Sequence, residues 1–130
     1  MWSVDYSLIE AWLDEQDEET VAGIFAALEL LQSRGPALGR PLVDAVKGSS
    51  LRNMKELRPA SVGRSEVRIL FAFDPERKAV MLLGGDKSKG RSCRSKWAGW
   101  YRRAIPLAER RYEWHLDQLG GHHGRARGLS

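Results

Sequence analysis

The chain has only one cysteine, Cys93, which excludes an internal disulfide and any zinc site built from several cysteines. It also has no apolar run approaching the roughly 18 residues that a membrane-spanning helix needs. Its amino terminus is acidic and lacks the basic and then apolar segments of a secretory signal. These absences favour a cytoplasmic protein with no membrane association.

The charge that is present lies unevenly along the 130 residues. Hydrophobic residues make up 42% and charged residues 29%, which is typical of one globular domain rather than of a disordered chain. The net charge is +4, but residues 1–46 carry −7 and residues 47–130 carry +11. Clustered Lys and Arg are typical of nucleic-acid binding, although a solvated basic surface without a partner explains the charge almost as well.

The first third of the chain predicts a strand and two helices. Residues 2–6 alternate between apolar and polar side chains, as a short strand does. Apolar residues recur with helical spacing within 8–13 and within 21–31, on either side of an acidic loop. Gly35 suits a helix C-cap and Pro36 cannot continue a helix, so the predicted helical hairpin ends there.

The rest of the chain predicts a sheet followed by a helix. Strands are expected at 54–57, 66–73 and 79–85, and "DPERK" between the last two favours an antiparallel turn. Pro106 fits the first turn of a helix, so the terminal helix is predicted to begin near Ile105, after a helical lead-in at 97–103. Residues 1–119 would then form one domain and residues 120–130 a disordered basic tail. The predicted inward positions of the helix are Ile105, Ala108, Tyr112, His115, Leu116 and Leu119.

A charged face is predicted in the middle of the sheet. By strand alternation, Glu56 and Arg58 share one face and Lys55 lies on the other. Arg68 interrupts an apolar strand, and burying an arginine is costly unless it is paired. Arg68 either forms a salt bridge with Glu56 or Glu66, or belongs to a functional cluster on an open concave face, with the helical hairpin covering the opposite face.

Three segments carry a resemblance to a known family. In order, "NMKELR", "RILFAFDPERKAVMLLGGDK" and "WYRRAIPLAERRYEWHL" resemble the HigB-like, phage-associated branch of the RelE/ParE toxin superfamily. The similarity covers residues 2–119. It implies an α+β, microbial-ribonuclease-like fold with a strand, a helical hairpin, a twisted antiparallel β-meander and a C-terminal helix.

The resemblance also implies a function. Members of the superfamily are toxins of type II toxin–antitoxin systems, and they typically cut mRNA on the translating ribosome with basic residues, without a metal or another cofactor. The implied partners are mRNA, the ribosome and a cognate antitoxin of the helix-turn-helix type. Arg68, Lys87 and Tyr101 match the basic residues and the tyrosine of the family site, although residues 88–99 form a longer insertion here. Glu56 lies where some branches carry an acid and others a lysine.

Metal-free RNA cleavage explains these residue types. The 2′-hydroxyl attacks its own phosphate, so a base must take the 2′ proton and cations must offset the charge of the phosphorane. Glu56 is the candidate base, and Tyr101 would stack on a nucleobase or donate a proton. The candidate charge stabilisers are Arg58, Arg68 and Lys87.

Further basic residues near the predicted site are expected to contact RNA. Gly84 and Gly85 are expected to end the last strand, so that Lys87 reaches the scissile phosphate. The expected RNA-binding residues are Lys55, Arg64, Lys89, Arg91, Arg94 and Lys96.

Two other functions stay open from the sequence. A ParE-like toxin would inhibit DNA gyrase by binding it and needs no cluster of phosphate-stabilising residues. A non-catalytic RNA- or ribosome-binding module would keep the basic surface without the chemistry. His115 is an alternative general base near neutral pH, but a histidine on the inward side of a helix is more often structural.

Overall fold

The computed structural model describes the backbone of residues 2–60, 66–86 and 93–128, and the side chains of residues 2–60, 66–86 and 99–120. The predicted α+β fold is confirmed. Its elements, in chain order, are β1 (Ser3–Asp5), η1 (Ser7–Ile9), α1 (Glu10–Asp14), α2 (Glu18–Arg34), η2 (Gly35–Ala37), β2 (Val43–Ala45), β3 (Met54–Leu57), β4 (Val67–Phe73), β5 (Lys78–Asp86) and α3 (Cys93–Gly128).

Five strands form one sheet in the order β1-β5-β4-β3-β2. Strands β2, β3 and β4 each pair antiparallel with the next strand along the chain, so the predicted meander is confirmed. Strand β1 adds to β5 in parallel. The sequence does not predict β2, because three residues that follow Gly39 and Pro41 are too few to show an alternating pattern.

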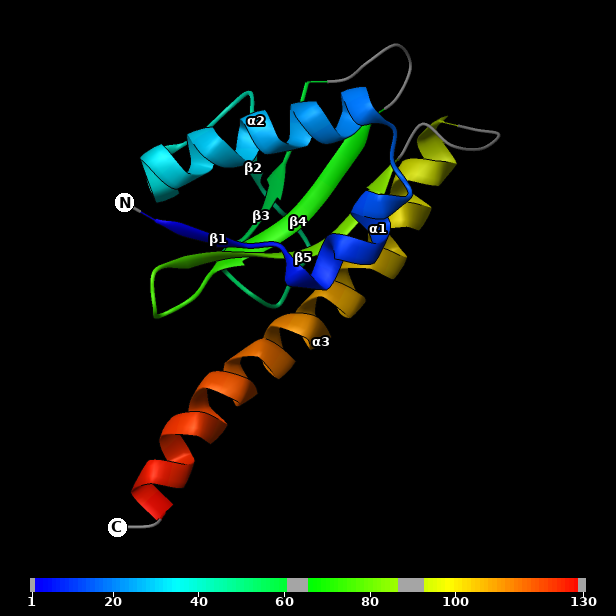
Figure 1. Ribbon diagram of the computed structural model, residues 1–130. Helices are drawn as coiled ribbons and strands as arrows, with labels where there is room; N and C mark the ends of the chain where they lie inside the picture. Colours follow the sequence, from blue (N-terminus) through cyan, green and yellow to red (C-terminus); the bar gives the residue numbers. More distant parts are fainter. Residues whose placement is uncertain (1, 61–65, 87–92, 129–130) are drawn as a thin grey trace.

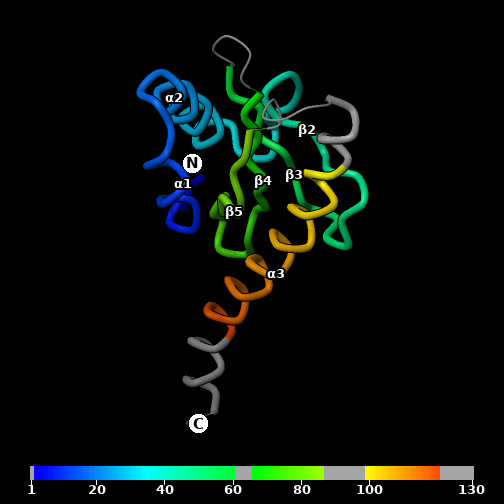
Figure 2. The backbone as a smooth tube through the Cα atoms, turned by 90° about the vertical axis from the view of Figure 1, so that its right-hand side faces the viewer, coloured from blue at the N-terminus to red at the C-terminus, as the bar shows by residue number. Residues whose placement is uncertain are grey.

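Helices cover both faces of the sheet (Figure 1). Figure 2 shows the sheet between α2 on one side and α3 on the other. On the α2 side, Ile24, Leu28 and Leu31 join Ile69 and Phe71 in one core cluster. On the α3 side, a second cluster contains Met54, Leu70, Ala72, Val80, Leu82, Ala104, Ile105, Ala108 and Tyr112. The prediction of an open concave face is therefore wrong, because α3 packs along it.

The boundaries of α2 follow from its capping residues. Asp17 precedes the helix, and its side chain accepts a hydrogen bond of 2.7 Å from the backbone N–H of Thr20. Gly35 follows the helix with a φ of 56°, a conformation that glycine adopts without a steric penalty. The predicted C-cap at Gly35 is confirmed.

The terminal helix begins earlier than predicted, at Cys93 instead of near Ile105, and contains Pro106 in its interior. Proline removes one backbone N–H donor from a helix, which favours a break. Here Ala104, Ile105 and Ala108 are buried against the sheet on both sides of Pro106, and that packing outweighs the lost hydrogen bond. The helical backbone extends to Gly128, and the disorder of residues 120–130 stays a prediction. Within the described residues, no helix has the length and apolar character needed to cross a bilayer.

Candidate active site

A buried carboxylate, that of Glu56 on β3, is the centre of the candidate site. Its side chain is only 4% exposed. Arg58 Nε lies 3.2 Å from Glu56 Oε2, and Arg68 Nε lies 3.7 Å from Glu56 Oε1. The Tyr101 hydroxyl donates a hydrogen bond to the same Oε1 atom. The structure therefore brings together four of the five predicted catalytic residues, and the predicted ion pair between Arg68 and Glu56 is part of that cluster.

The sheet and α3 position these four side chains from two directions. Glu56 lies between Asp44 of β2 and Leu70 of β4 in the sheet register. Arg68 comes two residues before Leu70 and therefore shares its face. Helix α3 crosses this face and carries Tyr101 into contact with Glu56. Helix α3, which begins earlier in the chain than predicted, therefore supplies the fourth side chain of the cluster.

Gly84 and Gly85 of β5 leave room for two tryptophan rings to pack against the sheet. Gly84 and Gly85 lie inside β5, so the prediction that they end the strand is wrong. A Cβ atom at Gly84 would overlap the Trp12 ring, and a Cβ atom at Gly85 would overlap the Trp100 ring. Neighbouring strand residues face opposite sides, so one indole packs on each face. The close approach at Gly85 fixes the residue next to Tyr101.

Burial and the neighbouring carboxylate keep Tyr101 protonated. Burial is the largest cause that raises the pKa of the Tyr101 phenol well above its ordinary value. The hydrogen bond to Glu56 and the charge of Glu56 raise this pKa further, and Arg68 and Arg58 oppose them. The phenol is therefore a donor toward Glu56 across the neutral pH range.

An acidic residue that sequence analysis missed extends the cluster to the edge strand. Asp44 Oδ2 lies 3.3 Å from Arg58 Nη2 and 3.1 Å from Arg40 Nη2. The hydrogen bond from Arg40 is the largest cause that lowers the pKa of Asp44, and the backbone N–H of Ala45 and the charge of Arg58 also lower it. The sequence carries no signal for this arrangement, because Arg40 and Asp44 lie in a turn and a strand, where a spacing of four does not predict a side-chain contact.

A cleft opens beside the cluster at the β2 edge of the sheet. Its volume is about 530 Å³. Glu56 and Tyr101 line it together with the exposed cations Arg40 and Lys47. The described residues that line it are Arg40, Asp44, Ala45, Val46, Lys47, Glu56, Arg58 and Tyr101. A polyanion can therefore approach the cluster through this cleft.

Several predicted residues do not join the cluster or lie outside the described part of the chain. Lys55 lies beside Phe71 in the sheet register, and Phe71 belongs to the core on the α2 side. Alternation along β3 therefore directs Lys55 away from Glu56. Outside the described residues are Lys87, Arg64, Lys89 and Arg91, together with the side chains of Arg94 and Lys96.

His115 has a structural role at the other end of the sheet. Its Nε2 atom lies 2.8 Å from Asp74 Oδ2, and both residues are buried. Asp74 also accepts hydrogen bonds from the backbone N–H groups of Glu76 and Lys78 in the β4–β5 turn. The pair ties α3 to this turn, which confirms the structural interpretation of His115.

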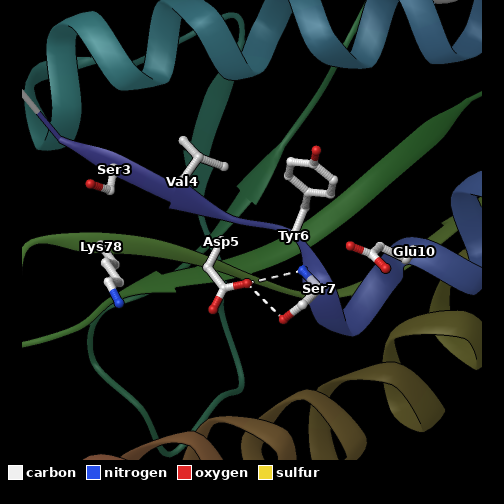
Figure 3. Close-up of a pocket in the computed structure, with 7 residues that line it drawn as sticks. All are labelled: Ser3, Val4, Asp5, Tyr6, Ser7, Glu10 and Lys78. Carbon is white, nitrogen blue, oxygen red and sulfur yellow. Dashed lines mark hydrogen bonds between the residues drawn. The ribbon is translucent and has the colours of Figure 1, made fainter.

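A second hollow, of about 290 Å³, lies at the opposite edge of the sheet beside β1 (Figure 3). The Asp5 carboxylate accepts hydrogen bonds there from the backbone N–H and the hydroxyl of Ser7. Glu10 adds a second acid, and Lys78 is the one cation among the described residues that line the hollow. Two acids and one cation repel phosphate, so this hollow is a poor candidate for RNA. Across the described residues, no group of three or more His, Cys, Asp or Glu side chains is placed to hold a metal ion.

Comparison with known proteins identifies the family. The model of the phage-derived Gp49-like family (DUF891) matches residues 11–113. The chain belongs to this Gp49-like family. Two relatives from Mycobacterium tuberculosis are named "Putative toxin HigB2" and "Putative toxin HigB3". The predicted membership of the HigB-like branch of the RelE superfamily is confirmed.

The two relatives differ in how much of their length the Gp49-like chain covers. HigB2 is 52% identical over 118 residues, which are 91% of this chain and 56% of HigB2. HigB3 is 45% identical over 114 residues, which are 87% of this chain and 92% of HigB3. The chain thus spans little more than half of the first relative and almost all of the second.

Proposed function

We propose that the chain is the toxin of a type II toxin–antitoxin system, a cytoplasmic endoribonuclease that cuts mRNA on the translating ribosome without a metal ion. Its family and the names of its two relatives support the toxin assignment. One observation carries the chemistry: a buried carboxylate, two arginines and a tyrosine meet beside an open cleft. A cognate antitoxin is the expected inhibitor.

The arginines of the cluster supply charge for the transition state. Cleavage by the 2′-hydroxyl places extra negative charge on the phosphorane, and preorganised cations stabilise it most when they are already held in place. Arg68 is 12% exposed and is fixed by Glu56 and by a hydrogen bond of 2.8 Å from its Nη1 to the Val67 carbonyl. Arg58 is more open, at 37% exposed, and faces the cleft. Lys87 is proposed as a further cation by resemblance.

Tyr101 connects the buried Glu56 carboxylate with the cleft. Glu56 lines the cleft but is only 3% exposed, so little of its carboxylate is open to RNA, whereas Tyr101 contacts this carboxylate through its hydroxyl and also lines the cleft. The 2′-hydroxyl can therefore pass its proton to the Tyr101 oxygen as the phenol proton passes to Glu56. The 2′ oxygen then bonds to phosphorus, the bond to the 5′ oxygen breaks, and the leaving oxygen takes a proton from water. The hydroxide that remains takes back the proton that Glu56 received, which restores the carboxylate. Glu56 acts as the base and Tyr101 as its relay.

The proposal is tested with purified protein in a defined translation reaction, followed by mapping of the 5′ ends of the mRNA fragments. Cleavage is expected at codons in the ribosomal decoding site and to the same extent when EDTA is added at a concentration that leaves ribosomes intact. The same transcript without ribosomes should stay uncut. If mRNA stayed intact on translating ribosomes and the protein inhibited DNA gyrase in a supercoiling assay, the nuclease proposal would be wrong. The protein would then be a gyrase inhibitor.

A further inference from the structure

Asp44 lies at the point where the edge strand meets the candidate site. It pairs with Glu56 in the register of β2 and β3, so the two carboxylates lie on neighbouring strands and share a face. Arg58 spans them: its Nε contacts Glu56 at 3.2 Å and its Nη2 contacts Asp44 at 3.3 Å. The guanidinium of Arg58 is therefore held at two of its three nitrogens by two separate strands.

Asp44 is itself held in place. Its Oδ1 atom accepts a hydrogen bond of 2.9 Å from the backbone N–H of Ala45, and its Oδ2 atom also contacts Arg40 at 3.1 Å. Arg58 has more freedom, because its side chain is 37% exposed beside the cleft. A long arginine side chain at such a site has many solvated rotamers to choose from. The fixed carboxylate of Asp44 favours the Arg58 rotamer in which the guanidinium contacts Glu56.

We infer that Asp44 is a positioning residue, which holds Arg58 in register with Glu56 and Tyr101 for RNA cleavage. This inference rests on the proposed function. Asp44 has no direct part in the chemistry, and its negative charge opposes phosphate binding. Among the described residues, the extended cluster contains three arginines and two carboxylates, so loss of the Asp44 charge raises the net charge of these groups from +1 to +2. Removing that charge should therefore strengthen phosphate binding and weaken catalysis at the same time.

The variant Asp44→Asn separates these two effects. Asparagine keeps the size of the side chain and can still accept the hydrogen bond from Ala45, but its amide cannot hold the guanidinium by charge. For mRNA on translating ribosomes, kcat is expected to fall about 10- to 100-fold, the scale of a misplaced reacting geometry, while KM stays constant or decreases. Asp44→Glu, which keeps the charge, should recover part of kcat. Glu29→Gln, an exposed acid on α2, is the matched control and should leave both constants unchanged.

A second measurement does not depend on activity. In nitrogen-15 NMR spectra, the Nε–H signal of Arg58 should exchange with water on the order of tenfold faster in Asp44→Asn than in the wild type, because the side chain is released. An unchanged exchange rate and an unchanged kcat in Asp44→Asn would overturn the positioning role. If the wild-type protein cut no mRNA but Asp44→Asn still released Arg58, the proposed function would be wrong and the structural coupling would stand. A parallel fall of melting temperature and kcat, with KM raised, would show a merely structural role.

Discussion

At the scale of single residues, two possible roles of Tyr101, proton relay and stacking on a nucleobase, lead to different predictions. Tyr101→Phe keeps the aromatic ring and removes only the hydroxyl that contacts Glu56. If the hydroxyl relays the 2′ proton, kcat should fall about 10²- to 10⁴-fold, the usual contribution of general acid–base catalysis. The measurement is single-turnover cleavage of ribosome-bound mRNA.

Tyr112→Phe is the matched control for this change. It removes a hydroxyl from the same helix, where the Tyr112 O–H donates a hydrogen bond of 3.0 Å to the Phe73 carbonyl. Stability should fall by about 1 kcal/mol and the cleavage rate should stay the same. If Tyr101→Phe cleaved at the wild-type rate and only Tyr101→Leu lost cleavage, the proton relay would be excluded. Stacking of the ring would then be the role of Tyr101.

Arg68 combines a structural and a proposed catalytic role, which two variants can separate. Arg68→Ala should slow cleavage by about 10²-fold or more, the effect of removing one preorganised charge-stabilising donor. The free energy of unfolding should decrease by about 1–3 kcal/mol, less than for a fully stranded buried charge, because Glu56 keeps Arg58 and Tyr101 as partners.

Arg68→Lys tests the charge-stabilising role while it keeps a long, positively charged side chain at this position. Urea denaturation and cleavage rates of both variants are the measurements. A charge-stabilising role predicts that Arg68→Lys is faster than Arg68→Ala. Equal wild-type rates in two folded variants would exclude Arg68 from the chemistry.

At the scale of elements, α3 is attached to the loop before β3 by one carboxylate. Glu109 Oε2 accepts hydrogen bonds from the Ser49 hydroxyl at 2.8 Å and from the Ser50 backbone N–H at 2.6 Å. The bond from Ser49 is the largest cause that lowers the pKa of Glu109 below its ordinary value of 4.5. A lowered folded-state pKa stabilises the fold above the unfolded-state pKa, and this contribution is lost as the pH falls through the folded-state value.

Glu109→Gln should therefore reduce stability at pH 7 and have little effect in acid. The expected loss is about 0.5–1 kcal/mol, at the lower end for such hydrogen bonds because the carboxylate is screened by solvent. Glu113→Gln, an exposed acid one turn further along α3, is the control. Urea denaturation at pH 7 and at pH 3 measures both variants. An equal loss for Glu109→Gln at the two pH values would show that the carboxylate charge is not what anchors the loop.

The same elements show how far the sequence could predict the fold and the candidate site. Alternation in β3 and β4 is a local property, and it correctly placed Glu56 and Arg68 on one face. Asp44 could not be predicted, because its contact with Arg58 depends on the register of a three-residue strand without a periodic signal. The continuous apolar run from Val80 to Leu83 correctly predicts a strand covered on both faces, and the expectation of an open face was inconsistent with it.

At the scale of the whole molecule, the two hollows lie at opposite edges of the sheet and differ in charge. The cleft beside β2 contains three cations, Arg40, Lys47 and Arg58, and two acids, whereas the hollow beside β1 contains two acids and Lys78 (Figure 3). Residues 1–46, which include β1, α1, α2 and also β2, carry −7, against +11 for the rest of the chain, so the cations of the cleft, and not its chain segment, distinguish the β2 edge. This distribution should orient the molecule on a polyanion with the β2 edge toward phosphate.

One lysine in each hollow makes this orientation measurable. Binding to ribosomes should weaken with salt, because each phosphate contact releases condensed counterions. For Lys47→Gln, the slope of log affinity against log salt should become less negative by about 0.7, the value for one contact with single-stranded nucleic acid. Lys78→Gln removes the same charge from the acidic hollow and should leave the slope unchanged. Because both variants have the same net charge, equal slopes in the two would mean that only the overall charge attracts the protein to ribosomes. A larger effect of Lys78→Gln would place the RNA at the β1 edge and remove the β2 cleft as the site of cleavage.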